Sequence, residues 1–248
     1  MALIDDIPAQ TRQVLSQITA LPPEFQAAGS YGPDTLLVFA YLASRRPIEF
    51  SAETGCGATT LLLSHISRRH VAFTLDIGHN QPTFDSPLLD RSRASFVLGP
   101  TQVTLPAYRF DQPLDFALID GPHGFPFPQL EYYYFYPALR TGALFVLDDI
   151  HIPIISHMFA FMREDAMFQL LAVQDKTAFF ERTPAPTTDP LGDEWYTQAY
   201  NEARFPLDAQ TLGPVWPRTS VFEPGTGKVR SEASLRSERL GLHGRKPQ

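Results

Sequence analysis

The chain contains a single cysteine, Cys56, among its 248 residues. One thiol cannot form a disulfide within the chain, so nothing in the sequence requires the oxidising compartments in which secreted domains are cross-linked. The N-terminal segment MALIDDIPAQ is acidic, whereas a secretory signal is basic and has a long apolar core. We therefore expect a cytoplasmic protein.

Long apolar runs and an excess of positive charge are also missing. The longest apolar stretch late in the chain, IPIISHMFAFM, is too short to span a bilayer. The formal net charge is -7, which disfavours general binding to nucleic-acid backbones and to anionic membranes. The sequence thus predicts no nucleic-acid partner and no membrane partner, and it leaves a homo-oligomer open.

Strand-like and helix-like segments alternate along the middle of the chain. We expect strands at 47–53, 70–76, 94–99, 114–120 and 143–149, and helices at 5–20, 34–44, 58–68, 127–140 and 152–165. Nearly continuous apolar strands are typical of a parallel sheet that is buried on both faces. Their alternation with helices predicts an α/β fold with a Rossmann-like, doubly wound sheet.

The end of this pattern differs from that of a dinucleotide-binding domain. The segment FQLLAVQDKTAFFERT has two β-like runs separated by QDK, which predicts an antiparallel hairpin. The sheet is therefore expected to be mostly parallel, with this hairpin closing it.

Composition divides the chain into three predicted parts. N-terminal helices span 1–45, the α/β core spans 46–183, and an irregular, proline-rich extension spans 184–248. Four aromatic residues are expected to pack the extension on the core: Trp195, Tyr196, Tyr200 and Trp216. The segment from Gly227 has six Lys or Arg against two acids, which predicts a solvated tail.

Two glycines, Gly55 and Gly57, lie between a predicted strand and a predicted helix. Glycine lets the backbone turn tightly and approach a ligand, and a helix N-terminus attracts negative charge or polar groups. Asp76 ends the next strand, where a carboxylate can accept hydrogen bonds from ribose hydroxyls. The combination predicts a cofactor that contains adenosine.

The residues around the turn favour one such cofactor. A nicotinamide dinucleotide site requires a small residue at the sixth position of G-x-G-x-x-G/A, where this chain has Thr60. Glu53, two residues before the first glycine, suits a cationic ligand better than a pyrophosphate. S-adenosylmethionine carries an ammonium and a sulfonium and has no phosphate. Cys56, between the glycines, is expected to fill the turn rather than to react.

A second group of polar residues follows the fourth and fifth predicted strands. Parallel strands deliver such residues to the same C-terminal edge, where ligands of open α/β sheets bind. Neighbouring strands lie about 4.8 Å apart, so three carboxylates would converge and repel each other unless they are protonated or bridged by a cation. A hard divalent ion such as Mg²⁺ would resolve this repulsion. The residues concerned are Asp120, His123, Asp148, Asp149 and His151.

Taken together, ETGCGATT, TLD, ALIDGPHGF and GALFVLDDI resemble the class I S-adenosylmethionine-dependent methyltransferases. The nearest likeness is to a bacterial small-molecule branch that is similar to sugar and macrolide O-methyltransferases, and it covers roughly residues 30–183. The chain departs from this pattern at 99–101, where GPT replaces an acidic residue near the adenine. By position, the resemblance implies these cofactor-binding residues: Glu53, Gly55, Cys56, Gly57, Thr60, Asp76, Asp120 and Gly121.

The same resemblance implies methyl transfer to a hydroxyl of a small metabolite or sugar. Asp120, Asp148 and Asp149 match the metal-binding acids of metal-dependent members, but not all relatives bind metal, so Mg²⁺ and a metal-free site both stay open. His123 and His151 are the candidate bases, because imidazole titrates near neutral pH, and Asp149 completes the catalytic set.

Other residues are expected to be structural. The segment EYYYFY (131–136) is expected to pack in the core or at an interface. His65 and His70, near a predicted helix end, are expected at the surface.

Two alternative functions remain. The first is an NAD(P)-dependent oxidoreductase that uses the same turn and Asp76; the missing third small residue and the closing hairpin argue against it. The second is a binding or scaffold protein that has the cofactor fold without catalysis, and GPT and the C-terminal extension keep it open.

Overall fold

The computed structural model describes residues 3–22, 31–78, 80–192, 198–204, 220–223 and 228–231. The chain divides into two units, Met1–Tyr200 and Asn201–Gln248. The first unit contains a sheet of seven strands: β1 (Ile48–Thr54), β2 (Ser67–Thr74), β3 (Ala94–Leu98), β4 (Leu114–Ile119), β5 (Leu139–Leu147), β6 (Phe168–Gln174) and β7 (Thr177–Arg182). Its helices are η1 (Leu3–Asp6), α1 (Ala9–Thr19), α2 (Pro33–Ala43), α3 (Ala58–Ile66), α4 (Gln81–Asp85), α5 (Thr101–Ala107), α6 (Phe127–Phe135), η3 (Tyr136–Ala138) and α7 (Pro153–Glu164).

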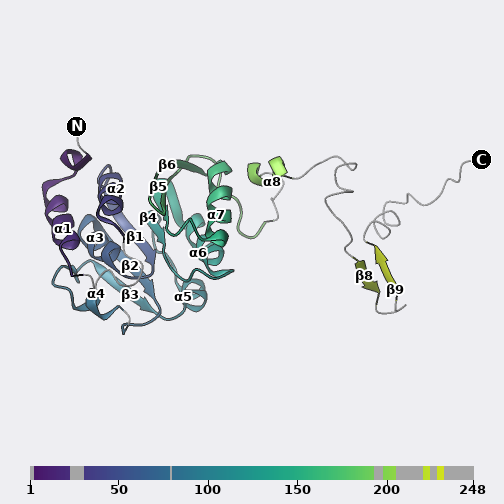
Figure 1. Cartoon of the computed structure of the whole chain (residues 1–248), viewed down its shortest axis with the longest axis horizontal. Coiled ribbons are helices and arrows are strands. Elements are labelled where there is room, and N and C mark those ends of the chain that lie inside the picture. The colour runs from purple at the N-terminus through teal and green to yellow at the C-terminus, as the bar shows by residue number, and fades with distance from the viewer. Residues whose placement is uncertain are drawn as a thin grey trace, which may run out of the picture. The chain divides into compact units, whose positions relative to one another are not determined.

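The strands are ordered β3-β2-β1-β4-β5-β7-β6 (Figure 1). Strands β1 to β5 are parallel, whereas β7 pairs antiparallel with both β5 and β6. The chain order reverses between β1 and β4, and such a switch point is where open α/β sheets bind ligands. Because β7 runs against β5, the turn between β6 and β7 lies at the C-terminal edge of the parallel strands.

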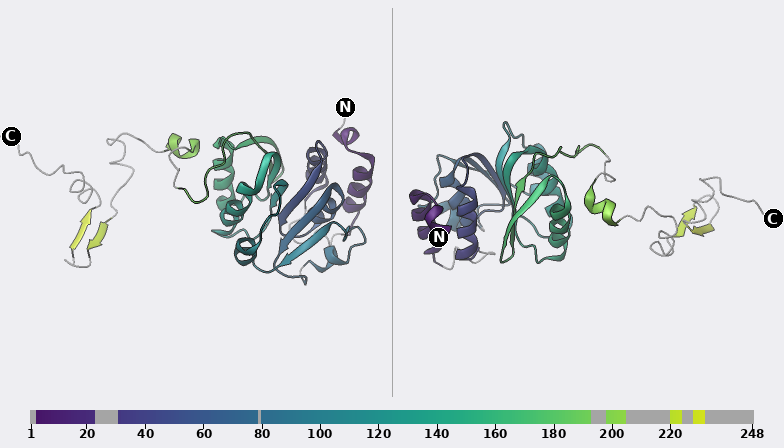
Figure 2. Two further views of the ribbon diagram at one scale, coloured as in Figure 1. Left: turned by 180° about the vertical axis from the view of Figure 1, so that it is seen from behind. Right: turned by 90° about the horizontal axis from the view of Figure 1, so that it is seen from above.

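Helices cover both faces of the sheet (Figure 2). One apolar cluster joins α1, α2 and α3 to the sheet, and Phe39 of α2 packs on Phe116 of β4 with ring centroids 5.0 Å apart. The other cluster joins α5, α6 and α7 to the opposite face, with Phe135 and Phe145 fully buried. The sheet is therefore buried on both faces, and a central strand such as β4 is buried along its whole length.

The expected fold is confirmed, including the antiparallel closing hairpin. Several boundaries differ from the prediction, among them two helix–strand junctions. Helix α3 ends at Ile66 and β2 begins at once at Ser67, while α6 ends at Phe135 and β5 begins at Leu139. The short helices α4 and α5 were not predicted, because five and seven residues are too few to show a helical period.

The expected packing of EYYYFY agrees with the structure. Phe135 and Tyr136 are buried, and Tyr132 stacks on Tyr136 at 4.9 Å. Among the described residues, no helix combines the length and apolar character needed to cross a bilayer.

The C-terminal part is less irregular than expected. Helix α8 (Ala199–Arg204) lies within it, and β8 (Ser220–Glu223) pairs antiparallel with β9 (Lys228–Ser231), so the predicted tail includes a strand. Tyr200 contacts the ring of Phe161 at 5.8 Å, as predicted for that residue. Trp195, Tyr196 and Trp216 lie outside the described residues. The first unit runs to Tyr200, and the predicted divisions at residues 45 and 183 stay predictions.

Candidate active site

The glycine turn fixes β1 against the end of β4. Gly55 has a φ of +91°, and a Cβ atom there would lie 2.4 Å from the carbonyl oxygen of Asp120. Both the left-handed backbone and this close approach require glycine. The Gly55 N–H also donates to the carbonyl oxygen of Phe73 in β2 (2.9 Å). The turn is thus tied to both strands that flank β1.

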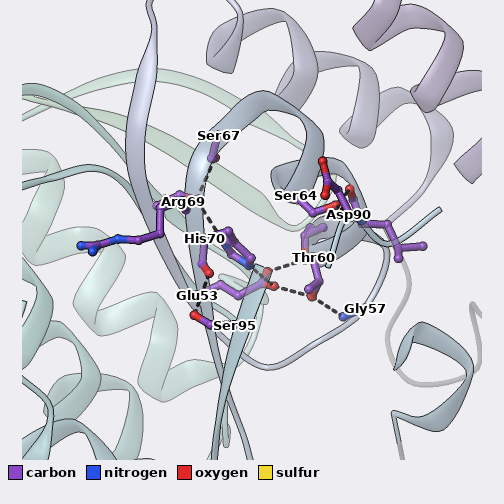
Figure 3. Close-up of polar contacts among 12 residues, drawn as sticks. Glu53, Gly57, Thr60, Ser64, Ser67, Arg69, His70, Asp90 and Ser95 are labelled. Carbon is purple, nitrogen blue, oxygen red and sulfur yellow. Dashed lines mark hydrogen bonds and ion pairs between the residues drawn. The ribbon is translucent and has the colours of Figure 1, made fainter. Parts of the chain in front are cut away.

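Thr60 has a structural role in this turn. The Gly57 N–H donates to Thr60 Oγ1 at 2.9 Å, and Thr60 Oγ1 in turn donates to Glu53 (Figure 3). Thr59 Oγ1 donates to the second carboxylate oxygen of Glu53 at 2.7 Å. The residue that departs from the dinucleotide pattern therefore caps helix α3 and joins it to Glu53.

Glu53 is fully buried, and one of its partners is a histidine that was expected at the surface. His70, expected at the surface, is completely buried, with Nε2 at 3.0 Å from Glu53 Oε1 and Nδ1 at 2.8 Å from Ser51 Oγ. The expectation was wrong because β2 starts at Ser67, so His70 is the fourth residue of the strand instead of its first, next to a helix end. Figure 3 shows the resulting chain of contacts from Ser67 to Gly57. Both oxygens of Glu53 are occupied by side chains of the protein, so direct contact between Glu53 and a cofactor stays a prediction.

Cys56 is partly buried in the turn. Burial, with the charge of Glu53 next in importance, raises the pKa of the thiol to about 12. The thiolate is the reactive form, so this cysteine is inert at neutral pH, in agreement with its expected packing role.

Gly121, the first glycine after β4, also lies very close to a neighbouring side chain. A Cβ atom at Gly121 would lie 2.2 Å from Oε1 of Glu131, which is fully buried on α6. Glu131 accepts a hydrogen bond from Thr54 Oγ1 (2.8 Å), and Thr54 Oγ1 accepts one from the Asp120 N–H (3.1 Å). Burial raises the pKa of Glu131 to about 7. Gly121 and Glu131 thus support the backbone between the glycine turn and the acidic residues.

Asp76 follows β2, beside the glycine turn, because β1 and β2 are neighbours. Its loop is held by Asn80, whose Nδ2 donates to Thr74 Oγ1 (2.7 Å) and to the Asp76 carbonyl oxygen (3.3 Å). Within the described part of the chain, no atom lies within 4 Å of a Cβ built on Gly57. Open space at the helix N-terminus with a carboxylate at the neighbouring strand end fits the adenosine cofactor that the sequence predicts.

His123, which follows β4, and Asp149, which follows β5, lie close together at the C-terminal edge of the parallel strands. His123 Nε2 lies 2.8 Å from Asp149 Oδ2, and 4.0 Å from Asp120 Oδ1. Asp149 has a φ of 55°, a left-handed conformation that turns its side chain back over the strand ends. His151 is farther away, with Nδ1 at 3.6 Å from Asp149 Oδ1 and 62% of its side chain exposed. His123, and not His151, thus lies within hydrogen-bonding distance of Asp149.

Lys176, which the sequence analysis did not select, is part of this cluster. Its Nζ donates to Asp149 Oδ1 at 2.7 Å and lies 3.3 Å from Asp148 Oδ2. Partial burial opposes the charge of Lys176, but the hydrogen bond to Asp149 and the charges of both aspartates outweigh it, so the pKa lies above its ordinary value. The sequence predicts the hairpin that contains the QDK turn but not the pairing of β7 with β5, and it is this pairing that brings Lys176 to the edge.

Tyr31 is a second residue that the sequence did not reveal. It is buried just before α2, and its Oη donates to Asp120 Oδ2 at 3.0 Å. Burial, and then the charge of Asp148, raise the pKa of Asp120 well above its usual range against the effect of this hydrogen bond. Asp120 is therefore held by the N-terminal region as well as by β4.

The acids do not assemble as the predicted magnesium site requires. The atoms that lie within 4.8 Å of one another belong to Asp120, His123 and Asp149. Asp148 is buried away from that group, because its Oδ1 accepts from Thr177 Oγ1 (2.5 Å) and its Oδ2 faces Lys176. Mg²⁺ prefers an octahedron of oxygen ligands, whereas this set contains an imidazole and an aspartate already paired with an ammonium. A three-carboxylate magnesium site does not fit the residues.

Comparison with known proteins finds similarity in sequence to one family and similarity in fold to several solved structures. Residues 52–150, less than half of the chain, match a family described as a methyltransferase domain. No curated protein sequence matches the chain. Among solved structures, a protein from Klebsiella pneumoniae has a TM-score of 0.56 at 14% identity, covering 68% of this chain and 90% of its own.

Two further structures share the fold. The O-methyltransferase TomG of Streptomyces achromogenes, solved with S-adenosylmethionine, has a TM-score of 0.55 at 13% identity, over 69% of this chain and 90% of its own. An O-methyltransferase of Bacillus cereus, solved with S-adenosylhomocysteine, has a TM-score of 0.51 at 14% identity, over 73% of this chain and all of its own.

The fold and the glycine turn define the class I methyltransferase architecture, and the family match agrees with it. Residues 52–150 are thus similar to a methyltransferase domain, and they lie within a sheet of the same fold as these structures.

Proposed function

We propose that the chain binds S-adenosylmethionine and transfers its methyl group to a hydroxyl of a small metabolite or sugar. The observation that carries the proposal is the 2.8 Å contact between His123 and Asp149 at the edge that also holds the glycine turn. Two structural neighbours solved with S-adenosylmethionine or its product are O-methyltransferases, which supports the same cofactor and acceptor class.

The residues divide the work in the following way. S-adenosylmethionine supplies a methyl group on a sulfonium, which a nucleophilic oxygen can displace in line. Gly55 and Gly57 shape the turn that receives it, and Asp76 holds the ribose. Catalysis then depends mainly on placing the acceptor oxygen against the methyl group.

His123 is the general base of the proposal. Asp149 beside Nε2 favours the proton on that nitrogen, which leaves Nδ1 to accept the acceptor's hydroxyl proton as the carbon–oxygen bond forms. Asp149 also stabilises the imidazolium that results, as a carboxylate does in hydrolytic triads. With 42% of its side chain exposed, His123 can reach a bound acceptor.

Magnesium is not part of this proposal. Although the sequence left Mg²⁺ open, the single charge of Lys176 offsets part of the negative charge of Asp148 and Asp149, and Asp148 is not among the side chains whose ligand atoms converge. The oxidoreductase alternative finds no support in the family match, which describes a methyltransferase domain.

The test is transfer of a radiolabelled methyl group from S-adenosylmethionine to a panel of small molecules that present hydroxyls, amines or thiols. We expect label on hydroxylated acceptors, and none with the His123→Ala variant. Label only on amines, or equal labelling by the variant, would contradict the assignment of acceptor and base.

A further inference from the structure

We infer that Lys176 provides the positive charge that a divalent metal would otherwise supply at this edge, so that methyl transfer needs no metal ion. The inference rests on the proposed function for its activity measurement, while its binding measurement is independent of any acceptor. Lys176 does not reach the reacting atoms through any contact described, so it is a positioning residue.

Lys176 is held in place from several sides. Its carbonyl oxygen accepts from the Ile150 N–H at 2.9 Å, which ties the hairpin turn to the loop that follows Asp149. The next residue, Thr177, bonds Asp148. The preceding residue, Asp175, has a left-handed φ of 52° and accepts from Thr35 Oγ1 at 2.7 Å. The ammonium is thus fixed by the backbone and neighbours of the turn, unlike that of a mobile surface lysine.

Most of the carboxylate oxygens in the cluster already contact side chains of the protein. Asp149 uses Oδ1 for Lys176 and Oδ2 for His123. Asp148 uses Oδ1 for Thr177, and its Oδ2, without a hydrogen bond among the described residues, lies 3.3 Å from the ammonium. Asp120 uses Oδ2 for Tyr31. A divalent ion would have to displace these partners.

An ion would also meet the charge of Lys176. Any ion bound to Asp149 would lie close to the ammonium that contacts Oδ1 of the same carboxylate, and like charges at such separations repel. The single charge of Lys176 instead neutralises part of the carboxylate group and orients Asp149, which in turn orients His123. A cation built into the chain thereby stabilises the geometry of the base.

The experiment compares the full-length protein with Lys176→Met, which removes the charge at similar length, and with Lys176→Arg, which keeps it. Lys228→Met is the matched control for loss of a lysine in the second unit. Titration calorimetry with MgCl₂ measures metal binding, and methyl transfer is measured with and without EDTA. Circular dichroism and thermal unfolding establish that each variant folds.

We expect no Mg²⁺ binding and full turnover in EDTA for the wild type, Lys176→Arg and Lys228→Met. We expect Lys176→Met to lose roughly 10²-fold in turnover, since small displacements of a catalytic group cost this much, and to bind Mg²⁺ in the vacated position. Wild-type turnover that EDTA abolishes and Mg²⁺ restores, or full turnover of Lys176→Met, would overturn the inference.

Failure of the proposed function and failure of the inference about Lys176 can be told apart. If the wild type methylates no acceptor, the proposed function fails, yet the calorimetry still decides the inference: Mg²⁺ heat with the wild type overturns it, and heat only with Lys176→Met supports it. If Lys176→Met does not fold, the response of the wild type and Lys176→Arg to EDTA and Mg²⁺ decides.

Discussion

His123 Nε2 lies 2.8 Å from Asp149 Oδ2, although the two residues follow different strands. The contact depends on the left-handed backbone of Asp149, which turns its carboxylate towards the loop after β4 while Asp148 faces β7. Adjacent aspartates of the same sequence motif thus have different tasks. One orients the candidate base, and the other is buried in the closing hairpin.

Replacing Asp149 by asparagine should reduce catalysis and leave cofactor binding intact. Asparagine tolerates the left-handed conformation that alanine would adopt at a cost, so the fold should be kept while the charge beside His123 is lost. We expect kcat to fall by about 10²–10⁴-fold, the usual contribution of a general base. Steady-state kinetics and a calorimetric Kd for S-adenosylmethionine measure the two effects separately.

The matched control for this variant is His151→Gln. His151 is mostly exposed and is 3.6 Å from Asp149, so its loss should change kcat by less than about threefold, well below the range for a general base. A larger loss for His151→Gln than for Asp149→Asn would assign the base to His151 instead.

The two glycines of the turn should respond differently to alanine. At Gly55 the backbone is left-handed and a Cβ atom would meet a backbone oxygen, so Gly55→Ala should lower the free energy of unfolding by about 3 kcal/mol. At Gly57 the φ is -177°, which any residue adopts, and space is open. Gly57→Ala should therefore keep its stability and weaken S-adenosylmethionine binding. Denaturant unfolding and calorimetry on both variants check this, and equal stability losses would refute it.

His70 should matter for stability far more than a surface histidine does. His70→Ala leaves Glu53 and Ser51 without their buried partner, and we expect the free energy of unfolding to fall by about 3 kcal/mol. His65, whose Nε2 contacts only the Leu88 carbonyl oxygen among its described hydrogen bonds, is the control, and His65→Ala should cost about 1 kcal/mol. Urea unfolding of the two variants gives the comparison; similar losses would mean that the buried network contributes little.

Glu131 should make stability depend on pH. Its pKa is about 7 in the folded protein against 4.5 as the ordinary value. Between these values the folded state binds more protons than the unfolded state, so stability should fall as pH rises from 4.5 to about 7 and then level off. The difference of about 2.5 pKa units corresponds to roughly 3 kcal/mol.

Glu131→Gln tests this because glutamine does not titrate. As the pH rises from 4.5 to above 7, the wild type should lose stability and the variant should not. The free energy of unfolding of the variant should therefore increase by roughly 3 kcal/mol relative to that of the wild type over this range. A difference between the two proteins that does not change with pH would show that Glu131 has an ordinary pKa.

Most of the fold could be predicted, because buried parallel strands are largely apolar and the closing hairpin has its own pattern. The cofactor turn was recognisable for a similar reason, since Gly55 is required by a local backbone conformation. Thr60 departs from the dinucleotide pattern, and in the structure it links Gly57 to Glu53.

The contacts that were missed depend on tertiary structure. Lys176 reaches the acids only because β7 lies between β5 and β6, which strand patterns along the chain do not reveal. Tyr31 precedes α2 and finds Asp120, 89 positions later, through helix packing. His70 was expected at the surface because the strand was predicted to begin there, whereas β2 begins three residues earlier and His70 lies in its buried interior.

The most direct test of the proposed cofactor is calorimetric titration of the wild-type protein with S-adenosylmethionine and, separately, with NAD⁺. We expect saturable heat with S-adenosylmethionine, a lower affinity for S-adenosylmethionine in Gly57→Ala, and no heat with NAD⁺. Saturable binding of NAD⁺ without any binding of S-adenosylmethionine would contradict it.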